Sequence, residues 1–356
     1  MPTAVDCAFE LTEEQQLLRD EVRRFTEERI QPDVARRDRE SEFPAGPIRE
    51  MGEMGLLGML VPESYGGAGL EAISYVLAVE EIARGCPATA VTMSVTNSVC
   101  CWPIVRFGSE ELKRRVLPQL AGGAIGGFGL TEPTSGSDAA SLRTTARREG
   151  DFWVLDGEKA WITNAGPGRW FVVLARTGPD PGHRGISAFV VPADAPGFAV
   201  GSHEHKLGLR ASATAALRFA DCRIPAANLL GDEGQGFKIA LATLDHSRLG
   251  IAAQAVGIHQ RALDLALAYA RERVQFGVPI ADHQGIQFQL AETATELEAA
   301  RALTRMAAAR EGESDAGRWA SEAKLYASEA AIRACHRSLQ IHGGNGFSEE
   351  YEIARL

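Results

Sequence analysis

The stretch FWVLDGEKAWITN, at residues 152–164, decides the fold class, because its apolar residues approach the period of two that is typical of a β-strand. Within it, Asp156-Gly157 predicts the two-residue turn of a hairpin. Three more apolar runs bounded by turn residues predict further strands, at residues 171–177, 185–192 and 215–225. We therefore expect residues 122–232 to form a small antiparallel β-barrel or sandwich.

On the N-terminal side of this segment, the apolar residues return at the spacing of helices. Thr12 can cap a first helix, and Gln15 stands where a capping box needs Glu or Gln. The apolar positions of that helix repeat every three or four residues, at Leu17, Leu18, Val22 and Phe25. A glycine-rich turn at residues 64–71 then leads into another helical stretch.

On the C-terminal side, a long helix is predicted from Gly236 onwards. One stripe of it alternates by four and three, at Phe237, Leu241, Leu244, Arg248, Ile251, Ala255, Ile258, Ala262, Leu265 and Tyr269. Two more helices are expected at residues 284–311 and 317–341. The fold class is therefore α+β, with an N-terminal helical domain (1–121), a middle β-domain (122–232) and a C-terminal helical bundle (233–356).

Composition and charge exclude several functions. The 356 residues carry a formal net charge of −10 without a basic cluster, which argues against a nucleic-acid partner. The six cysteines include no C-x-x-C pair, so reduced thiols are expected, and His203 and His205 lack a third metal ligand nearby. The apolar runs look too short and too broken to span a membrane, and no leader is recognisable. We expect a cytoplasmic, bacterial protein without a metal site.

The segment GQGFKIA, at residues 234–240, superficially resembles a dinucleotide-binding fingerprint. Such a fingerprint needs a preceding parallel strand and a βαβ unit. Here the preceding segment leaves an antiparallel region. We therefore interpret it as a helix start whose small residues permit close packing.

Two segments carry most of the chemical information: FGLTEPTSGSDAA at residues 128–140 and KAWITNA at residues 159–165. The first is a loop rich in small hydroxyl residues and free of basic charge. Its backbone N–H groups and the Thr131 and Ser137 hydroxyls can hold the polar edges of a flat, uncharged ring. Residues 161–163 add an aromatic wall and another hydroxyl. An ordinary turn beside a buried core Trp would explain the same residues.

LTEPTSGSD and KAWITNA resemble the two signature segments of the acyl-CoA dehydrogenases. The resemblance continues in chain order through LTEEQQLLRDEVRRF, GISAFVVP, KLGLRASATAALRFADCRIP, LDHSRLGIAAQAVGIHQRALD, YARERVQFGVPIADHQ and QIHGGNGFSEEY. It covers essentially the whole chain and is closest to the short-chain (butyryl-CoA) and short branched-chain members. The resemblance implies the three-domain fold of that family and FAD as the cofactor.

The family's cofactor contacts map onto two groups of residues in this sequence. The first group is implied to line the flavin and the start of the CoA path: Phe128, Leu130, Thr131, Gly136, Ser137, Trp161, Ile162 and Thr163. The second is implied to reach the FAD of a neighbouring subunit: Arg273, Phe276, Gln284, Gln340, Gly343 and Gly344. Because each FAD site then needs two chains, a homotetramer built as a dimer of dimers is implied.

The resemblance also implies the substrate and the reaction. Asp245 and Arg248, together with Ser137, match residues that contact the CoA arm. The reaction is α,β-dehydrogenation of an acyl-CoA thioester, with electrons passed to an electron-transfer flavoprotein. Gln254 and Trp102 are expected to crowd the end of the acyl cavity, which favours short chains. Butyryl-CoA is the first choice of substrate and 2-methylbutyryl-CoA the second.

The catalytic base is the one part of the family pattern that this sequence does not supply. Most members carry it in a segment resembling IYEGTS, which would lie beyond Leu356, so we expect the bundle to be incomplete at its end. A minority place it where this chain has Ser247, whose hydroxyl is too weak a base. Glu349, Glu350 and Glu352 are expected to be solvated. Two alternatives stay open: a family-like flavin oxidase or monooxygenase, and a non-catalytic acyl-CoA-binding flavoprotein.

Overall fold

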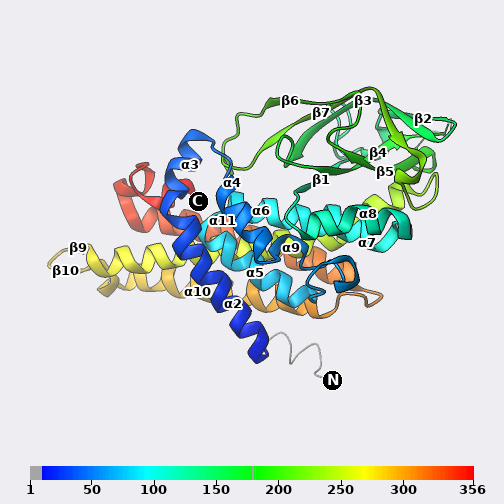
Figure 1. The fold of residues 1–356 in the computed structure, drawn as a ribbon. Coiled ribbons are helices and arrows are strands. Elements are labelled where there is room, and N and C mark those ends of the chain that lie inside the picture. The colour runs from blue at the N-terminus through cyan, green and yellow to red at the C-terminus, as the bar shows by residue number, and fades with distance from the viewer. Residues whose placement is uncertain (1–9, 179, 181) are drawn as a thin grey trace.

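The computed structural model describes residues 10–178, 180 and 182–356, and its elements follow the predicted order of helices, β-sheet and helices. In Figure 1 the sheet lies on one side of the molecule, above α7 and α8, and the long C-terminal helices lie on the other side. The predicted α+β architecture is confirmed.

From residue 10 onwards, the described N-terminal part contains seven α-helices: α2 (Glu13–Phe25), α3 (Val34–Glu40), α4 (Ala45–Glu53), α5 (Ala72–Gly85), α6 (Pro87–Val95), α7 (Trp102–Phe107) and α8 (Glu110–Ala121). The capping box predicted for the first helix is present. The Gln15 backbone N–H donates to Thr12 Oγ1 at 3.2 Å, and the Thr12 N–H donates to Gln15 Oε1 at 3.1 Å. Two otherwise unpaired donors at the helix start are thereby satisfied.

The most apolar helix of the protein runs without interruption from Pro87 to Phe107, because a π-helical turn at Thr96–Cys101 joins α6 to α7. Its 21 residues are long and apolar enough to cross a membrane, so the expectation that the apolar runs are too short and too broken was wrong. However, 83 % of its most apolar window is buried inside the protein. This helix is part of the core, where N-terminal helices and the sheet meet.

The sheet contains eight strands: β1 (Gly126–Gly129), β2 (Thr145–Glu149), β3 (Phe152–Thr163), β4 (Trp170–Arg176), β5 (Ile186–Pro192), β6 (Phe198–His203), β7 (Thr214–Pro225) and β8 (Leu229–Leu230). Their order is β6-β7-β3-β2-β4-β5-β8, and β1 pairs with β4. The predicted purely antiparallel sheet was wrong in one respect, because β1 and β2 both pair with β4 in parallel. β1 and β2 pair with successive parts of one edge of β4, because β5 occupies the other edge, so the chain continues in the same direction after the loop between them.

The predicted hairpin turn at Asp156-Gly157 was also wrong. These residues lie within the continuous strand β3, where the register with β7 shifts between Leu155 and Gly157. The turn that joins β2 to β3 is instead at Gly150, whose φ is 57°. Gly157 has a φ of 143°, and a Cβ there would lie 2.6 Å from Thr144 Oγ1. A glycine is therefore needed for a β-bulge and not for a turn.

The two faces of β4 belong to two different cores. Trp170, Val172 and Leu174 pack with residues of α8 and of the apolar helix, whereas Phe171 and Val173 pack with the other strands. The folded sheet therefore has its own core on one face and is attached to the helices by the other. Because both faces of β4 are buried, its sequence is a nearly continuous apolar run, WFVVLA.

The C-terminal part contains three long helices, α9 (Gly236–Glu272), α10 (Gln284–Ala309) and α11 (Ala316–His342), with a small hairpin of β9 (Val274–Gln275) and β10 (Val278–Pro279) after α9. Gly236 starts α9 as predicted, and a Cβ there would lie 2.4 Å from the Ser187 carbonyl carbon. The close packing expected of this segment is therefore confirmed.

The stripe that was predicted to face the bundle core is only partly buried. Leu241 and Ile251 on it are exposed. A neighbouring face is the most buried, because Gly250 and Gly257 allow α5 to approach closely. A Cβ at Gly257 would lie 2.3 Å from the Glu80 carbonyl oxygen. The small residues, and not the largest apolar ones, determine which face of α9 is buried.

The described cysteines agree with a reduced protein. Cys86, Cys100, Cys101, Cys222 and Cys335 are all free thiols, and Cys7 lies outside the described residues. Among the residues that the structure describes, no three His, Cys, Asp or Glu side chains form a group that could hold a metal ion.

Candidate active site

The two signature segments are joined by a buried ion pair. Lys159 Nζ lies 2.7 Å from Glu132 Oε1, and the two side chains are 0 % and 4 % exposed. Beside it, the Ala160 backbone N–H donates to the Thr131 carbonyl oxygen at 2.9 Å. The loop that follows β1 is therefore fixed against β3 by one ion pair and one backbone hydrogen bond.

The Glu132 carboxylate has further donors. It accepts hydrogen bonds from the Arg143 and Thr144 backbone N–H groups at 2.6 Å and 2.9 Å, and Lys159 Nζ also donates to the Leu130 carbonyl oxygen at 3.3 Å. Burial raises the pKa of Glu132, but the charge and hydrogen bond of Lys159 outweigh it and lower the pKa overall. Burial lowers the pKa of Lys159 to about 8, against the opposing effect of Glu132. Both groups are charged at neutral pH.

This ion pair was not predicted from the sequence, although Glu132 and Lys159 both lie in the two signature segments. The available signal was a lysine followed in the same strand by the apolar residues Ala160, Trp161 and Ile162. A lysine buried in a strand requires a carboxylate partner, and the other signature segment supplies one in Glu132.

Next to Lys159, the strand presents an aromatic side chain to solvent. The register with β7 shifts between Lys159 and Ile162, and Trp161 takes a left-handed backbone conformation with φ of 62°. The Trp161 side chain is 62 % exposed, while that of Ile162 is buried in the core of the sheet and Thr163 is half-buried. Trp161 and Thr163 can therefore offer side chains to a cofactor, whereas Ile162 can offer its backbone.

The loop opposite Trp161 is polar and free of basic charge, and Asp138 is its one exposed charged side chain. Phe128, Leu130 and Thr131 are half-buried, and Gly136 and Ser137 are exposed. A Cβ at Gly136 would meet no atom within 4 Å, so the backbone there is open to a ligand. With Glu132 neutralised by Lys159, hydroxyls, backbone N–H groups and aromatic surface remain. This set suits a flat, uncharged ring with polar edges.

The second predicted group of cofactor residues lies at the far end of the helical bundle. Arg273, Phe276 and Gln284 follow the end of α9, and Gln340, Gly343 and Gly344 stand at the end of α11. The six residues are exposed, and Phe276 is 95 % exposed. Asn345 Nδ2 donates to the Tyr269 hydroxyl at 2.9 Å, and the His342 and Tyr269 rings stack with centroids 4.4 Å apart. These contacts hold the two helix ends together.

Within one chain, the two groups of cofactor residues are far apart. Figure 1 shows the β9–β10 hairpin and the end of α11 projecting from the side of the bundle opposite the sheet. The structure therefore brings each group together but does not bring one group to the other.

The predicted CoA-binding residues form an ion pair on α9. Arg248 and Asp245 contact each other one turn apart, and both are half-buried. Between them, the Ser247 hydroxyl donates to the Leu244 carbonyl oxygen at 3.0 Å in its own helix. That hydrogen bond gives Ser247 a structural partner and no activating base.

The two residues predicted to crowd the acyl cavity meet α9 at different points. Trp102 stacks on His246, which is about 12 Å along the helix from Gln254 at a rise of about 1.5 Å per residue. Gln254 is buried, and its Oε1 has no hydrogen-bond partner among the described residues. Of these two residues, Gln254 lines the apolar pocket between α9 and α11, and Trp102 does not.

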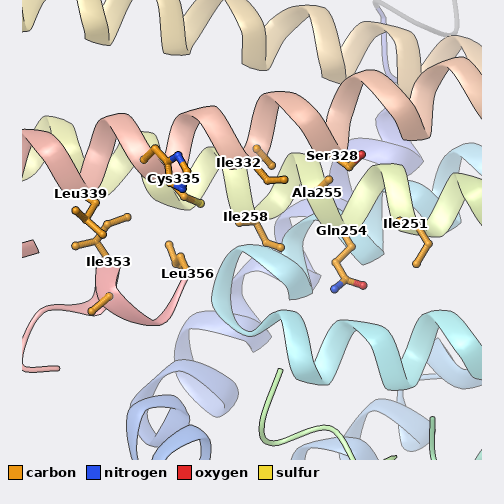
Figure 2. A pocket seen from close by; sticks show the side chains of 13 residues that line it. Ile251, Gln254, Ala255, Ile258, Ser328, Ile332, Cys335, Leu339, Ile353 and Leu356 are labelled. Carbon is orange, nitrogen blue, oxygen red and sulfur yellow. The ribbon is translucent and has the colours of Figure 1, made fainter. Parts of the chain in front are cut away.

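A pocket of about 410 Å³ lies between α9, α11 and the end of the chain, with an apolar lining that includes Ile251, Ile258, Ile332, Leu339, Ile353 and Leu356. Figure 2 shows Gln254 towards one end of this pocket and Leu356 towards the other. Among the described residues that line it, no carboxylate is present. The pocket suits an apolar chain, and its lining also includes the imidazole of His336.

The glutamates near the end of the chain behave differently from one another. Glu349 and Glu350 are exposed, as expected. Glu352 is half-buried and pairs with Arg261 on α9 and with Arg355, so the expectation that it is solvated was wrong. The pair with Arg261 connects this last part of the chain to α9.

Comparisons with known proteins agree along the whole chain. Three family models match: acyl-CoA dehydrogenase N-terminal domain at residues 12–124, middle domain at residues 127–222 and C-terminal domain at residues 234–356. The human short-chain specific acyl-CoA dehydrogenase, a mitochondrial protein, is 50 % identical over 350 residues, which are 98 % of this chain and 85 % of that protein.

Two solved structures are similar throughout. Butyryl-CoA dehydrogenase from Megasphaera elsdenii has a TM-score of 0.95 and 42 % identity, over 98 % of this chain and 92 % of that one. A chain from a structure described as the electron transferring flavoprotein of Acidaminococcus fermentans has a TM-score of 0.96 and 44 % identity, over the same two shares.

Proposed function

This chain belongs to the acyl-CoA dehydrogenase family, and on that premise we propose that it catalyses FAD-dependent α,β-dehydrogenation of short-chain acyl-CoA thioesters, with an electron-transfer flavoprotein as electron acceptor. The observation that carries this proposal is the similarity to a short-chain specific enzyme along nearly the whole chain. It does not favour the oxidase and non-catalytic alternatives.

The residues of the two predicted groups fit FAD. The first group offers the Thr131 and Ser137 hydroxyls, the open backbone at Gly136 and the exposed Trp161 ring to the flavin. The second group offers the guanidinium of Arg273, which suits paired phosphate oxygens, and the glycines Gly343 and Gly344, around which a Cβ would meet no atom within 4 Å. When bound, FAD would supply the acceptor for the hydride that leaves the β-carbon of the acyl chain.

The chain's own residues have three tasks in this reaction. Asp245 and Arg248, with Ser137, hold the CoA arm. Gln254 limits the depth of the acyl pocket, which supports a preference for butyryl-CoA and then 2-methylbutyryl-CoA. A hydrogen bond to the thioester oxygen stabilises the enolate that forms as the α-proton leaves. The residue that takes this proton stays a prediction: a Glu beyond Leu356, with Ser247 in the alternative position.

We also propose a homotetramer, a dimer of dimers. The support is the distance between the two groups of cofactor residues in one chain, together with exposed apolar side chains such as Phe276 beside the second group. Light scattering should give the mass of four chains. A monomer that retains FAD would contradict this arrangement. A cytoplasmic location is part of the same proposal, and cell fractionation tests it.

The decisive experiment is an anaerobic titration of the purified flavoprotein. Butyryl-CoA should reduce the flavin if a base is available, and crotonyl-CoA should shift the flavin spectrum in either case. Octanoyl-CoA should bind more weakly than butyryl-CoA. A protein without flavin, or one that prefers octanoyl-CoA, would overturn the proposal.

A further inference from the structure

The Glu132–Lys159 ion pair is costly for the fold, which suggests a role beyond stability. Both side chains are almost completely buried. Removing a charge from water costs several kcal/mol even in a relaxed protein, and a buried pair regains this only with good geometry and further hydrogen bonds. Here three additional donor–acceptor contacts complete the pair, two to the carboxylate and one from the ammonium.

The sequence neighbours of the pair are the candidate flavin contacts. Glu132 directly follows Thr131, and Lys159 stands two residues before Trp161. Because the pair and the bond from the Ala160 N–H to the Thr131 carbonyl hold the two segments together, they also set the separation between the Thr131 hydroxyl and the Trp161 ring.

The backbone of Trp161 is held in a conformation that it would not adopt alone. A left-handed conformation at a residue other than glycine is strained and persists only where the surroundings impose it. Lys159 anchors the strand before Trp161. After it, Ile162 is buried, and Asn164 Nδ2 donates to the Gly126 carbonyl oxygen at 2.7 Å. Trp161 is therefore fixed from both sides.

We propose that Glu132 and Lys159 are positioning residues for FAD, which hold Thr131 and Trp161 at the separation that the flavin requires. This inference rests on the proposed function. The flavin then binds to a site that is already formed, because the pair has imposed the loop and strand geometry before binding.

The test compares single and double variants of the holoenzyme. Glu132→Gln and Lys159→Met each leave one buried charge without its partner, so both should melt at lower temperature and release FAD at least tenfold faster. The double variant E132Q/K159M removes both charges of the pair, so its melting temperature should recover. Its FAD release should stay fast, because the ion pair that holds the two segments together is absent. Free-flavin fluorescence after dilution measures release.

Two further variants make the test specific. Glu158→Gln is the matched control, since Glu158 precedes Lys159 on the same strand but pairs with Arg218 on the exposed face, and it should leave FAD release unchanged. Glu132→Asp keeps both charges and shortens the side chain by one methylene, so it should fold and still release FAD several-fold faster.

The outcomes separate this inference from the proposed function. A double variant, or an E132D variant, that retains FAD as firmly as the wild type would show that the pair is only structural. A wild-type protein that binds no FAD would overturn the proposed function itself.

Discussion

The imidazole ring of His246 lies stacked on the indole ring of Trp102, with centroids 4.7 Å apart and planes inclined by 10°. His246 Nδ1 is also 2.8 Å from the carboxylate of Glu311, the second residue after α10. This cluster of three side chains connects the N-terminal helix α7, the substrate helix α9 and the α10–α11 connection. In the chain, His246 of this cluster directly follows Asp245.

Loss of the Glu311 charge should destabilise this connection. Burial raises the pKa of Glu311, but the hydrogen bond and charge of His246 outweigh it, so the pKa is lowered overall. Glu311→Gln should reduce the free energy of unfolding by about 1–2 kcal/mol, the usual scale for a partly exposed, charge-assisted hydrogen bond. Urea denaturation at pH 7 measures it. Glu313→Gln, in the same connection, loses only a surface ion pair with Arg310 and should therefore cost less than about 1 kcal/mol, and equal effects of the two variants would contradict this assignment.

His259 should make the protein sensitive to mild acid. Burial lowers its pKa to about 4, against a hydrogen bond with the Thr293 carbonyl oxygen. Between pH 6.5 and 4, the unfolded chain binds a proton that the folded His259 does not. The free energy of unfolding should therefore decrease as the pH is lowered across this window. A shift of two pKa units corresponds to about 3 kcal/mol.

The variant His259→Gln isolates this effect. It should flatten the decrease of the melting temperature between pH 6.5 and 4, although it lowers stability at pH 7. His336→Gln, on the exposed side of α11, is the control. An unchanged acid slope in His259→Gln would show that other groups cause it.

Removal of the Arg248 charge should weaken acyl-CoA binding. If Arg248 holds the CoA arm, Arg248→Gln loses a hydrogen bond from a charged donor, worth about 1.5–3 kcal/mol or roughly a tenfold to hundredfold change in affinity. The shift of the flavin spectrum with crotonyl-CoA measures the dissociation constant. Arg271→Gln, near the end of the same helix, should bind crotonyl-CoA as the wild type does. Equal affinities for Arg248→Gln and the wild type would remove Arg248 from the site.

Shortening of Gln254 should lengthen the preferred acyl chain. Gln254→Ala opens one end of the pocket between α9 and α11. Each methylene that newly fits is worth about 0.8 kcal/mol, or roughly fourfold in affinity. Dissociation constants of enoyl-CoA ligands with four, six and eight acyl carbons measure the change.

Trp102→Phe is the informative comparison for that series, because Trp102 stacks on His246 and not at Gln254. It should lower stability and leave the chain-length preference as it is. A longer preferred chain in Trp102→Phe alone would place the end of the acyl cavity at His246.

The elements that could be predicted from the sequence are those in which one physical pattern dominates. The long C-terminal helices and the strands β3, β4, β5 and β7 follow from a sustained period of apolar residues. Asp156-Gly157 could not be assigned, because a hairpin turn and a β-bulge both need a glycine with positive φ. Only the contact of Gly157 with Thr144 distinguishes them.

Part of the candidate site could also be predicted from the sequence, and part of it could not. The segments that contain Thr131 and Trp161 could be identified from residue types alone. The pairing of Glu132 with Lys159 could not, because it joins residues 27 positions apart, one in the loop after β1 and one in β3. The buried face of α9 was missed for a related reason: the approach of α5 to Gly250 and Gly257 is a tertiary contact that helical periodicity does not contain.

The apolar helix from Pro87 to Phe107 has a consequence for the life of the protein in the cell. A newly made chain presents this segment before the sheet and the C-terminal helices that later cover it have been synthesised. During that interval it has the composition of a membrane segment and the aggregation risk of any unshielded apolar helix. Burial under the sheet and the C-terminal helices removes this risk once they have docked, so a variant that delays docking of the sheet is expected to yield more insoluble protein.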